Sequence, residues 1–193
     1  MAGDLLLLRR AATRSIQGGL IMNRDRHQAV GKQVFPIGKS TPDHRTPMSF
    51  LKNLGHFDLD AAASKENAIC SNYFDEEING LIQPWYGRVW VNPPYSQIGK
   101  WIDKAIDECQ VKRNCREVVF LVPSRTCTRW FRTAFESAMA VQFVHGRLDF
   151  HGPNMNKEKR ANAPFPSVLI VITSHVPVFG PVVRMIDREG LPL

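Results

Sequence analysis

The sequence lacks a hydrophobic segment near its start that would serve as a signal or membrane anchor. The one candidate, Leu5–Leu8, has four leucines and is followed at once by Arg9 and Arg10. A membrane-spanning helix needs about twenty apolar residues, and a secretory signal carries its charges before the apolar run rather than after it. We therefore expect a cytoplasmic protein with no membrane partner.

The sequence also lacks the residue spacings that commonly hold a metal ion. Its four cysteines include no C-x-x-C pair, and its six histidines show neither H-x-x-x-H nor H-E-x-x-H spacing. Zinc sites are often built from such pairs, so we expect no metal. Four cysteines in 193 residues are too few for a disulfide scaffold. We expect reduced thiols at Cys70, Cys109, Cys115 and Cys127.

Positive charge is concentrated at the start of the chain. Residues 1–40 carry seven basic and two acidic side chains, whereas the rest carries 18 basic and 16 acidic ones. A Gly18–Gly19 pair and Pro36 disfavour regular structure in this leader. We expect a disordered basic leader over residues 1–40, with Met22 as an alternative start of translation. An Arg-rich start also matches an organellar transit peptide.

The rest of the chain alternates between strand-like and helix-like patterns. Expected strands are short apolar or β-branched runs at residues 56–62, 88–91, 118–122, 141–144 and 167–172. Expected helices begin at Pro47 with Thr46 as cap, after Ser64 as cap, at residue 98 (to 109) and at residue 129 (to 139). Such alternation indicates an α/β fold with a mostly parallel sheet.

No helical pattern separates the last two expected strands. We therefore expect them to form an antiparallel hairpin with a long tip at residues 151–164. The chain then divides into the leader, one domain over residues 41–176 and a C-terminal tail over residues 177–193.

The segment with the most chemical information is Asn92-Pro93-Pro94-Tyr95, which follows a buried strand and precedes an amphipathic helix. Ligands of open α/β sheets bind at the carboxyl ends of such strands. Two prolines stiffen the turn and remove two backbone donors. The Asn92 side-chain oxygen and the Pro93 carbonyl remain as acceptors for an amino group, and Tyr95 adds a flat face for a planar ring. The segment therefore predicts methyl transfer to an amine of a nucleobase, with these four residues as the catalytic set. The same acceptors also suit an amine of RNA or of a protein glutamine.

With these residues in place, the chain resembles the phage-type Dam family of DNA N6-adenine methyltransferases. The resemblance runs from about Thr46 to Ile172 and is carried by T-P (46–47), F-D-L-D-A-A-A-S (57–64), N-A-I-C (67–70), G-L-I-Q-P-W (80–85), G-R-V-W-V-N-P-P-Y-S (87–96), W-I-D-K-A (101–105), V-P-S-R-T (122–126), G-R-L-D-F (146–150) and A-P-F-P-S (163–167). It implies a Rossmann-like methyltransferase fold, S-adenosylmethionine as methyl donor and double-stranded DNA as substrate, with GATC as the target word. It also implies a bacterial host cell or a phage-infected cell as the setting. The biological role stays open between restriction protection and host mimicry.

The resemblance also implies which residues bind the donor. The family's T-P segment, matched by Thr46 and Pro47, touches the methionine part of the donor. An acidic residue ends the first strand and binds the donor; Asp58 and Asp60 are the candidates, and Asp60 is favoured because it precedes the small residue Ala61. A solvated or capping role is the alternative for either aspartate.

One donor-site position departs from the family pattern. Where relatives commonly carry an acidic residue before Gly80-Leu81, this chain has Asn79. Asn79 keeps an acceptor oxygen but loses the charge, so we expect weakened rather than abolished donor binding. A catalytically weak or inactive DNA- or cofactor-binding protein, such as a prophage relic, is therefore the alternative from another functional class.

Basic side chains after the central strand and near the hairpin tip are the DNA-contact candidates, since cations there can neutralise phosphates. They are Arg125, Arg129, Arg147, Lys157, Lys159 and Arg160. The alternative for each is a solvated loop charge. The tip is the first candidate for target recognition, because the sequence has no room for a large separate recognition domain.

Overall fold

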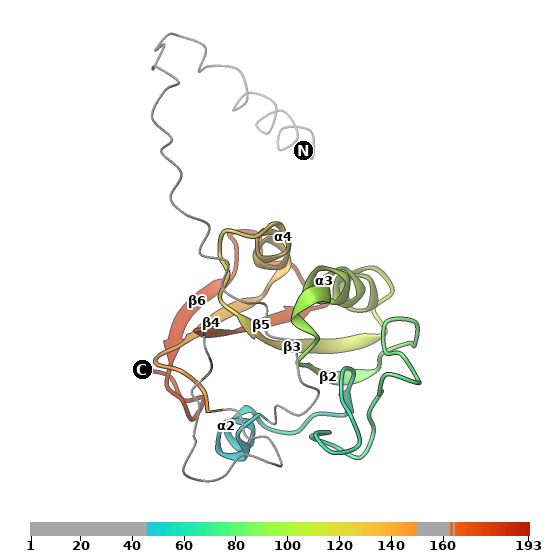
Figure 1. Ribbon diagram of the computed structural model, residues 1–193. Helices are drawn as coiled ribbons and strands as arrows, with labels where there is room; N and C mark the ends of the chain where they lie inside the picture. Colours follow the sequence, from blue (N-terminus) through green and yellow to red (C-terminus); the bar gives the residue numbers. More distant parts are fainter. Residues whose placement is uncertain (1–45, 150–162, 164) are drawn as a thin grey trace, which may run out of the picture. The chain divides into compact units, whose positions relative to one another are not determined.

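A computed structural model describes residues 46–149, 163 and 165–193 (Figure 1). Its six-stranded sheet has the order β1-β2-β3-β5-β4-β6. The strands are β1 (Leu59–Asp60), β2 (Gly87–Val91), β3 (Cys115–Pro123), β4 (Ala140–Val144), β5 (Ser167–Thr173) and β6 (Val182–Ile186). The helices are α2 (Met48–Leu54), a 3-10 turn η1 (Tyr95–Gln97), α3 (Ile98–Ile106), a π-helical turn η2 (Asp107–Val111) and α4 (Arg129–Ser137).

Five of the six strands run in one direction. β1, β2 and β3 pair in parallel, β5 is antiparallel to both β3 and β4, and β6 is parallel to β4. The expected α/β class and the antiparallel pairing of the last two expected strands are therefore confirmed. The carboxyl ends of the five codirectional strands and the amino end of β5 lie at one end of the sheet, which we call the carboxyl edge.

The core has two layers because the side chains of β3 alternate between the faces of the sheet. Val118, Phe120 and Val122 belong to the core that includes residues of α3 and α4, whereas Val119 and Leu121 belong to the core that includes residues of α2. Figure 1 shows α3 and α4 on one side of the sheet and α2 on the other. Each face of the sheet is therefore covered by at least one helix.

The first expected helix forms, but its cap was predicted wrongly. The residue at the cap position of α2 is Pro47, not Thr46, and no side chain caps the helix. Pro47 has a helical φ of −55° but an extended ψ of 130°, so it stands just outside the helix. The fixed proline φ made the first helical position plausible from sequence, but ψ is free and depends on the approach of the preceding chain.

The expected helix after Ser64 is only a turn. The backbone amides of Asn67 and Ala68 donate to the Ser64 carbonyl, and the Ser64 amide donates to Asn67 Oδ1 at 2.6 Å. This segment lacks the apolar stripe that would offset the cost of helix nucleation. Asn67 also satisfies the backbone locally, as asparagine does in turns.

Several boundaries differ from expectation. β1 covers only two residues of the seven expected, α3 gives way to η2 after Ile106, and α4 ends at Ser137. Within the segment expected to be a C-terminal tail, residues 182–186 form β6 and join the sheet beside β4. The leader lies outside the described residues, as does the hairpin tip except for Ala163.

A buried carboxylate, Glu108, fastens the end of α3 to the rest of the domain. Its side chain is 1% exposed and accepts hydrogen bonds from Lys104 Nζ at 2.6 Å and Lys112 Nζ at 3.1 Å. Asn114 Nδ2 and the Trp85 amide donate to it at 2.9 and 3.3 Å. Burial raises the pKa of Glu108, but these donors outweigh burial and lower it from 4.5 to about 2. The ionised form is therefore the one that stabilises the fold.

We expect Glu108→Gln to lower the free energy of unfolding at pH 7 by about 3 kcal/mol, because the folded pKa lies about 2.5 units below the unfolded one. The stabilisation is present above pH 4.5 and is lost as pH falls through about 2, so the difference between parent and variant shrinks across that window. Urea unfolding at pH 7 and pH 3 measures it. Glu136→Gln, which removes an exposed pair with Arg132, is the control and changes stability by less than about 1 kcal/mol.

Candidate active site at the carboxyl edge

Four chain segments meet at the carboxyl edge of the sheet. They are residues 60–61 at the end of β1, residues 92–95 after β2, residues 124–125 after β3 and residues 165–166 before β5. The strand register brings them together, because Asp60 lies opposite Trp90, Val91 lies opposite Phe120 and Pro123 lies opposite Ser167. The sequence does not show this register.

Asn92 and its two prolines form a stiff turn between β2 and η1. Pro93 is buried, Pro94 has a φ of −54°, and the Gln97 amide donates to the Pro94 carbonyl at 2.9 Å. The Asn92 side chain is partly exposed. Among the residues that the structure describes, none hydrogen-bonds to that side chain, so its amide oxygen remains available as an acceptor.

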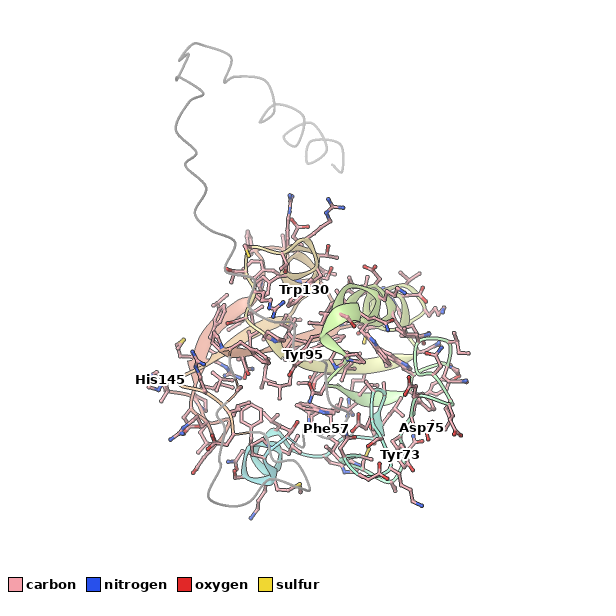
Figure 2. All side chains as sticks on the ribbon, in the orientation of Figure 1. Phe57, Tyr73, Asp75, Tyr95, Trp130 and His145 are labelled. Atoms are coloured by element: carbon pink, nitrogen blue, oxygen red, sulfur yellow. The ribbon has the colours of Figure 1, made fainter. Side chains whose placement is uncertain are left out.

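Tyr95 follows the turn and is partly buried against the core of α3 and α4. Burial raises the pKa of its phenol to about 12, although the nearby Arg125 charge acts in the opposite direction. The phenol is therefore neutral at physiological pH and offers a ring face rather than a base. In the view of Figure 2, Tyr95 lies between Trp130 of α4 and Phe57, which precedes β1.

Asp60 places a buried carboxyl group at the end of β1. The residue is 3% exposed, and its two oxygens accept from the Ala62 amide at 3.4 Å and the Ile69 amide at 3.2 Å. Burial raises the pKa of Asp60 from 3.8 to about 7, with these two amides lowering it less. The carboxyl therefore titrates near neutral pH, where a positively charged ligand group beside it would favour the ionised form.

The second aspartate candidate lies away from this edge. Asp58 precedes β1, and its Oδ2 accepts from the Arg88 amide at 2.7 Å and lies 3.9 Å from Arg116 Nη2. These partners belong to the beginnings of β2 and β3. The structure thus brings Asp60 to the turn of Asn92 and leaves Asp58 at the opposite end of the strands.

Asn79 and Gly80 pass close to the end of β1. A Cβ at Gly80 would lie 2.1 Å from the Ala61 carbonyl oxygen, so only glycine permits this approach. Asn79 is exposed and has a left-handed φ of 56°, a conformation that asparagine adopts more readily than most residues. Its Oδ1 accepts from the Leu81 amide at 3.3 Å. Ala61 is fully buried, and the Thr46 side chain is 7% exposed next to Pro47 at the start of α2.

We expect Asn79→Asp to tighten binding of S-adenosylmethionine by about three- to tenfold, since hydrogen bonds to a charged acceptor are stronger than those to a neutral one. Aspartate also tolerates the left-handed backbone, so the fold is kept. Titration calorimetry on parent and variant measures the effect. Asn53→Asp, on the exposed side of α2, is the control for the added charge, and equal donor affinities in all three proteins would count against a donor contact at residue 79.

Two of the basic candidates lie in and just after the turn that follows β3. Arg125 and Arg129 are exposed, and within residues 46–149, 163 and 165–193 neither has an acidic side chain at ion-pair distance. Arg147 instead donates through Nη1 to the Ala163 carbonyl at 3.1 Å. Lys157, Lys159 and Arg160 lie outside the described residues, so their placement stays a prediction.

Comparison with known proteins identifies the family. Residues 40–184 match the family model described as DNA N-6-adenine-methyltransferase (Dam). The chain belongs to the Dam family. It is 35% identical over 123 residues to a DNA N-6-adenine-methyltransferase of Escherichia phage T1, across 58% of this chain and 50% of that protein. It is 30% identical over 123 residues to the protein of the same name from Haemophilus phage HP1, across 63% of this chain and 69% of that one.

Membership in the Dam family confirms the resemblance seen in the sequence. The structure adds the spatial arrangement of the motifs that carry it. The chain matches only half the length of the T1 relative. Three of the motifs that carry the resemblance span the ends of β1, β2 and β3 and lead to the same edge of the sheet: F-D-L-D-A-A-A-S to Asp60, G-R-V-W-V-N-P-P-Y-S to Asn92 and V-P-S-R-T to Arg125. The motifs are distant in sequence but meet in one place.

Two features of this Dam-family site were missed from the sequence. One is the backbone approach of Gly80 to Ala61, which an isolated glycine does not reveal. The other is Phe165, whose ring lies 5.1 Å from that of Tyr95. The prolines on both sides of Phe165 were a usable signal for a fixed side chain, because a residue before proline is restricted to extended conformations.

A cavity of about 370 Å³ lies between α2 and the segment at Ile69–Cys70, whose Ile69 amide donates to Asp60. None of the predicted site residues lines it. In the described part of the chain, no three His, Cys, Asp or Glu side chains are grouped to hold a metal ion. The helices of that part include none long and apolar enough to cross a membrane.

Proposed function

We propose that this Dam-family protein is a site-specific adenine methyltransferase that moves a methyl group from S-adenosylmethionine to N6 of adenine in double-stranded DNA. The observation that carries the proposal is the stiff Asn92–Tyr95 turn, whose Asn92 amide oxygen has no hydrogen-bond partner among the described residues, at the same edge of the sheet as the buried Asp60 carboxyl. The fold that we propose for it is a Rossmann-like methyltransferase domain, and the order of β1, β2 and β3 around this edge supports that assignment.

The acceptors of the turn suit the chemistry of an exocyclic amine. The adenine N6 lone pair is delocalised into the ring, so the amine is a weak nucleophile. Hydrogen bonds accepted by the Asn92 oxygen and the Pro93 carbonyl localise that lone pair and stabilise the positive charge that develops on nitrogen during attack. No base is needed before the attack, and the surplus proton leaves N6 afterwards to solvent. The neutral phenol of Tyr95 fits a stacking role.

The residues at the end of β1 fit a donor with a cationic amino-acid part. S-adenosylmethionine, when bound, supplies an electrophilic methyl group. The ionised Asp60 carboxylate would accept hydrogen bonds from its ammonium or ribose groups. Ala61 is small, and the chain at Gly80 passes close to it, which would leave room for a ligand. Thr46, Pro47 and Asn79 complete the proposed donor site.

A duplex hides adenine N6, so the base must leave the stack, which costs roughly a few kcal/mol. Stacking on Tyr95 returns about 1–3 kcal/mol. Contacts to phosphates supply the remainder, and the exposed Arg125 and Arg129 lie on the same side as the turn. We place Arg147, Lys157, Lys159 and Arg160 in the same role and GATC as the target word.

Expression in a host without adenine methylation, followed by sequencing that detects N6-methyladenine, tests the activity and the target word together. The expected result is modification at one short word. Incubation of the purified protein with methyl-labelled donor and DNA, RNA or protein separates the rival substrates, and label in RNA or protein alone would overturn the DNA assignment. A folded protein that binds donor and labels nothing would identify an inactive relic.

A further inference from the structure

Phe165 contacts the Tyr95 ring from a different part of the chain. The two ring centroids lie 5.1 Å apart with an angle of 88° between the ring planes, an edge-to-face arrangement. Phe165 stands two residues before β5, whereas Tyr95 begins η1 after β2. We propose that Phe165 is a positioning residue that fixes the ring plane of Tyr95 for methyl transfer; this rests on the function proposed above.

The orientation of Tyr95 depends on packing rather than on hydrogen bonds. Within the described residues, no group hydrogen-bonds to its hydroxyl. One part of the ring packs against the core of α3 and α4. Phe165 belongs to the other core, on the α2 face of the sheet. The contact between the two rings therefore joins the two layers at the carboxyl edge, and it supplies the restraint that a hydrogen bond would otherwise give.

The backbone of Phe165 is restrained by Pro166, which follows it in the sequence and disfavours a helical conformation at Phe165. The Pro166 carbonyl accepts from the Ser124 amide at 2.9 Å and from Ser124 Oγ at 3.3 Å. Ser167 then pairs with Pro123 in the register of β3 and β5. A ring on such a segment is well placed to restrain a neighbour.

The Tyr95 side of the contact is equally stiff, because Pro93 and Pro94 precede it. Two proline-braced segments thus meet through their aromatic rings. Loss of the Phe165 ring frees the Tyr95 side chain to leave the orientation in which a flipped base stacks beside Asn92. The donor contacts at Asp60 and Ala61 have separate supports, so donor affinity is unaffected. The effect falls on the methyl-transfer step.

A double-mutant cycle tests this inference. The proteins are the parent, Phe165→Leu, Tyr95→Leu and the double variant, each checked for folding by circular dichroism and thermal unfolding. The substrate is genomic duplex DNA from a methylation-free host, which contains every target word. We expect Phe165→Leu to lower the single-turnover rate by about three- to tenfold, the size of one aromatic pair. We expect donor Kd to stay within twofold and Phe165→Leu to have no further effect in the Tyr95→Leu background.

Phe165→Tyr keeps the ring, so its single-turnover rate should stay within twofold of the parent rate. This variant also tests the inference if Phe165→Leu does not fold. Phe135→Leu, at a 37% exposed position on α4, is the matched control and should leave the rate unchanged. Equal rate losses from Phe165→Leu in both backgrounds, or no rescue by Phe165→Tyr, would overturn the inference while the methyltransferase assignment stands. A parent protein without turnover would overturn both the methyltransferase assignment and the positioning role of Phe165. The same cycle measured by urea unfolding would then show only whether the two rings are energetically coupled.

Discussion

Asn92→Ala should abolish most methylation while leaving the fold and donor binding intact. In the proposed mechanism the Asn92 amide oxygen is one of two acceptors that stabilise the charge developing on N6, and no described protein group competes for it. Removal of one such preorganised group typically lowers the chemical rate by about 100- to 1,000-fold. Single-turnover methylation of unmethylated genomic duplex measures this loss, and calorimetry with S-adenosylmethionine confirms that donor affinity stays within about threefold.

Two further variants separate the acceptor from other causes. Asn92→Asp keeps an oxygen acceptor in the same place and should retain more activity than Asn92→Ala. Asn53→Ala removes an exposed asparagine that donates to the Glu189 carbonyl at 2.9 Å, far along the chain from the turn, and should leave the rate unchanged. If cells expressing Asn92→Ala carry as much N6-methyladenine as cells expressing the parent, the catalytic assignment of Asn92 is wrong.

Donor affinity should depend on pH through Asp60. Since its pKa is raised to about 7 in the free protein, binding of a cationic donor must first ionise it at lower pH. We expect the Kd for S-adenosylmethionine to be about tenfold weaker at pH 6 than at pH 8. Asp60→Asn should lose about 10- to 100-fold in affinity at pH 8, the usual size of a hydrogen bond to a charged group, and should lose the pH dependence.

The same carboxyl affects stability with the opposite sign to Glu108. The folded pKa of Asp60 lies above the unfolded value of 3.8, so the donor-free protein loses stability as pH rises from about 4 to about 7. The loss is about 4 kcal/mol relative to Asp60→Asn, from about three pKa units. Asp58→Asn is the matched control for both measurements, because Asp58 is partly exposed at the other end of β1. A parent whose donor affinity is flat between pH 6 and pH 8 would contradict the role of Asp60.

The parts of the candidate site that depend on adjacent residues could be predicted from the sequence. Asn92–Tyr95 combines two prolines with a strand before it and a helix after it, so both its stiffness and its exposure follow from a few adjacent residues. The expected strands near residues 88, 118, 141 and 167 formed for the same reason, since apolar runs of this length have to be buried. Trp85, Trp90 and Trp101, three large apolar side chains in or near these runs, are 0%, 1% and 6% exposed.

The sequence did not reveal contacts between residues that are far apart in the chain. The sequence favoured Asp60 but kept Asp58 as a candidate, because the Arg88 amide that binds Asp58 at the other end of the strands is 30 residues away. β6 has four exposed residues and one buried residue, so its sequence has no apolar alternation that would predict a strand. It forms because the edge of β4 is open to pairing. From the sequence, Glu108 is indistinguishable from an exposed helical charge. Its burial becomes evident only from the hydrogen bonds that Asn114 and Trp85 donate to it in the folded protein.

The sequence by itself determined the class of fold and the chemistry of the turn, because proline stiffness, strand burial and the acceptor on Asn92 are properties of adjacent residues. The tertiary structure placed Asp60, which the sequence favoured over Asp58, at the edge that Asn92 shares, and it alone brought Phe165 into contact with Tyr95. The physical reason is that strand order and register set which distant side chains come within contact distance, and burial then changes their pKa and their freedom to move.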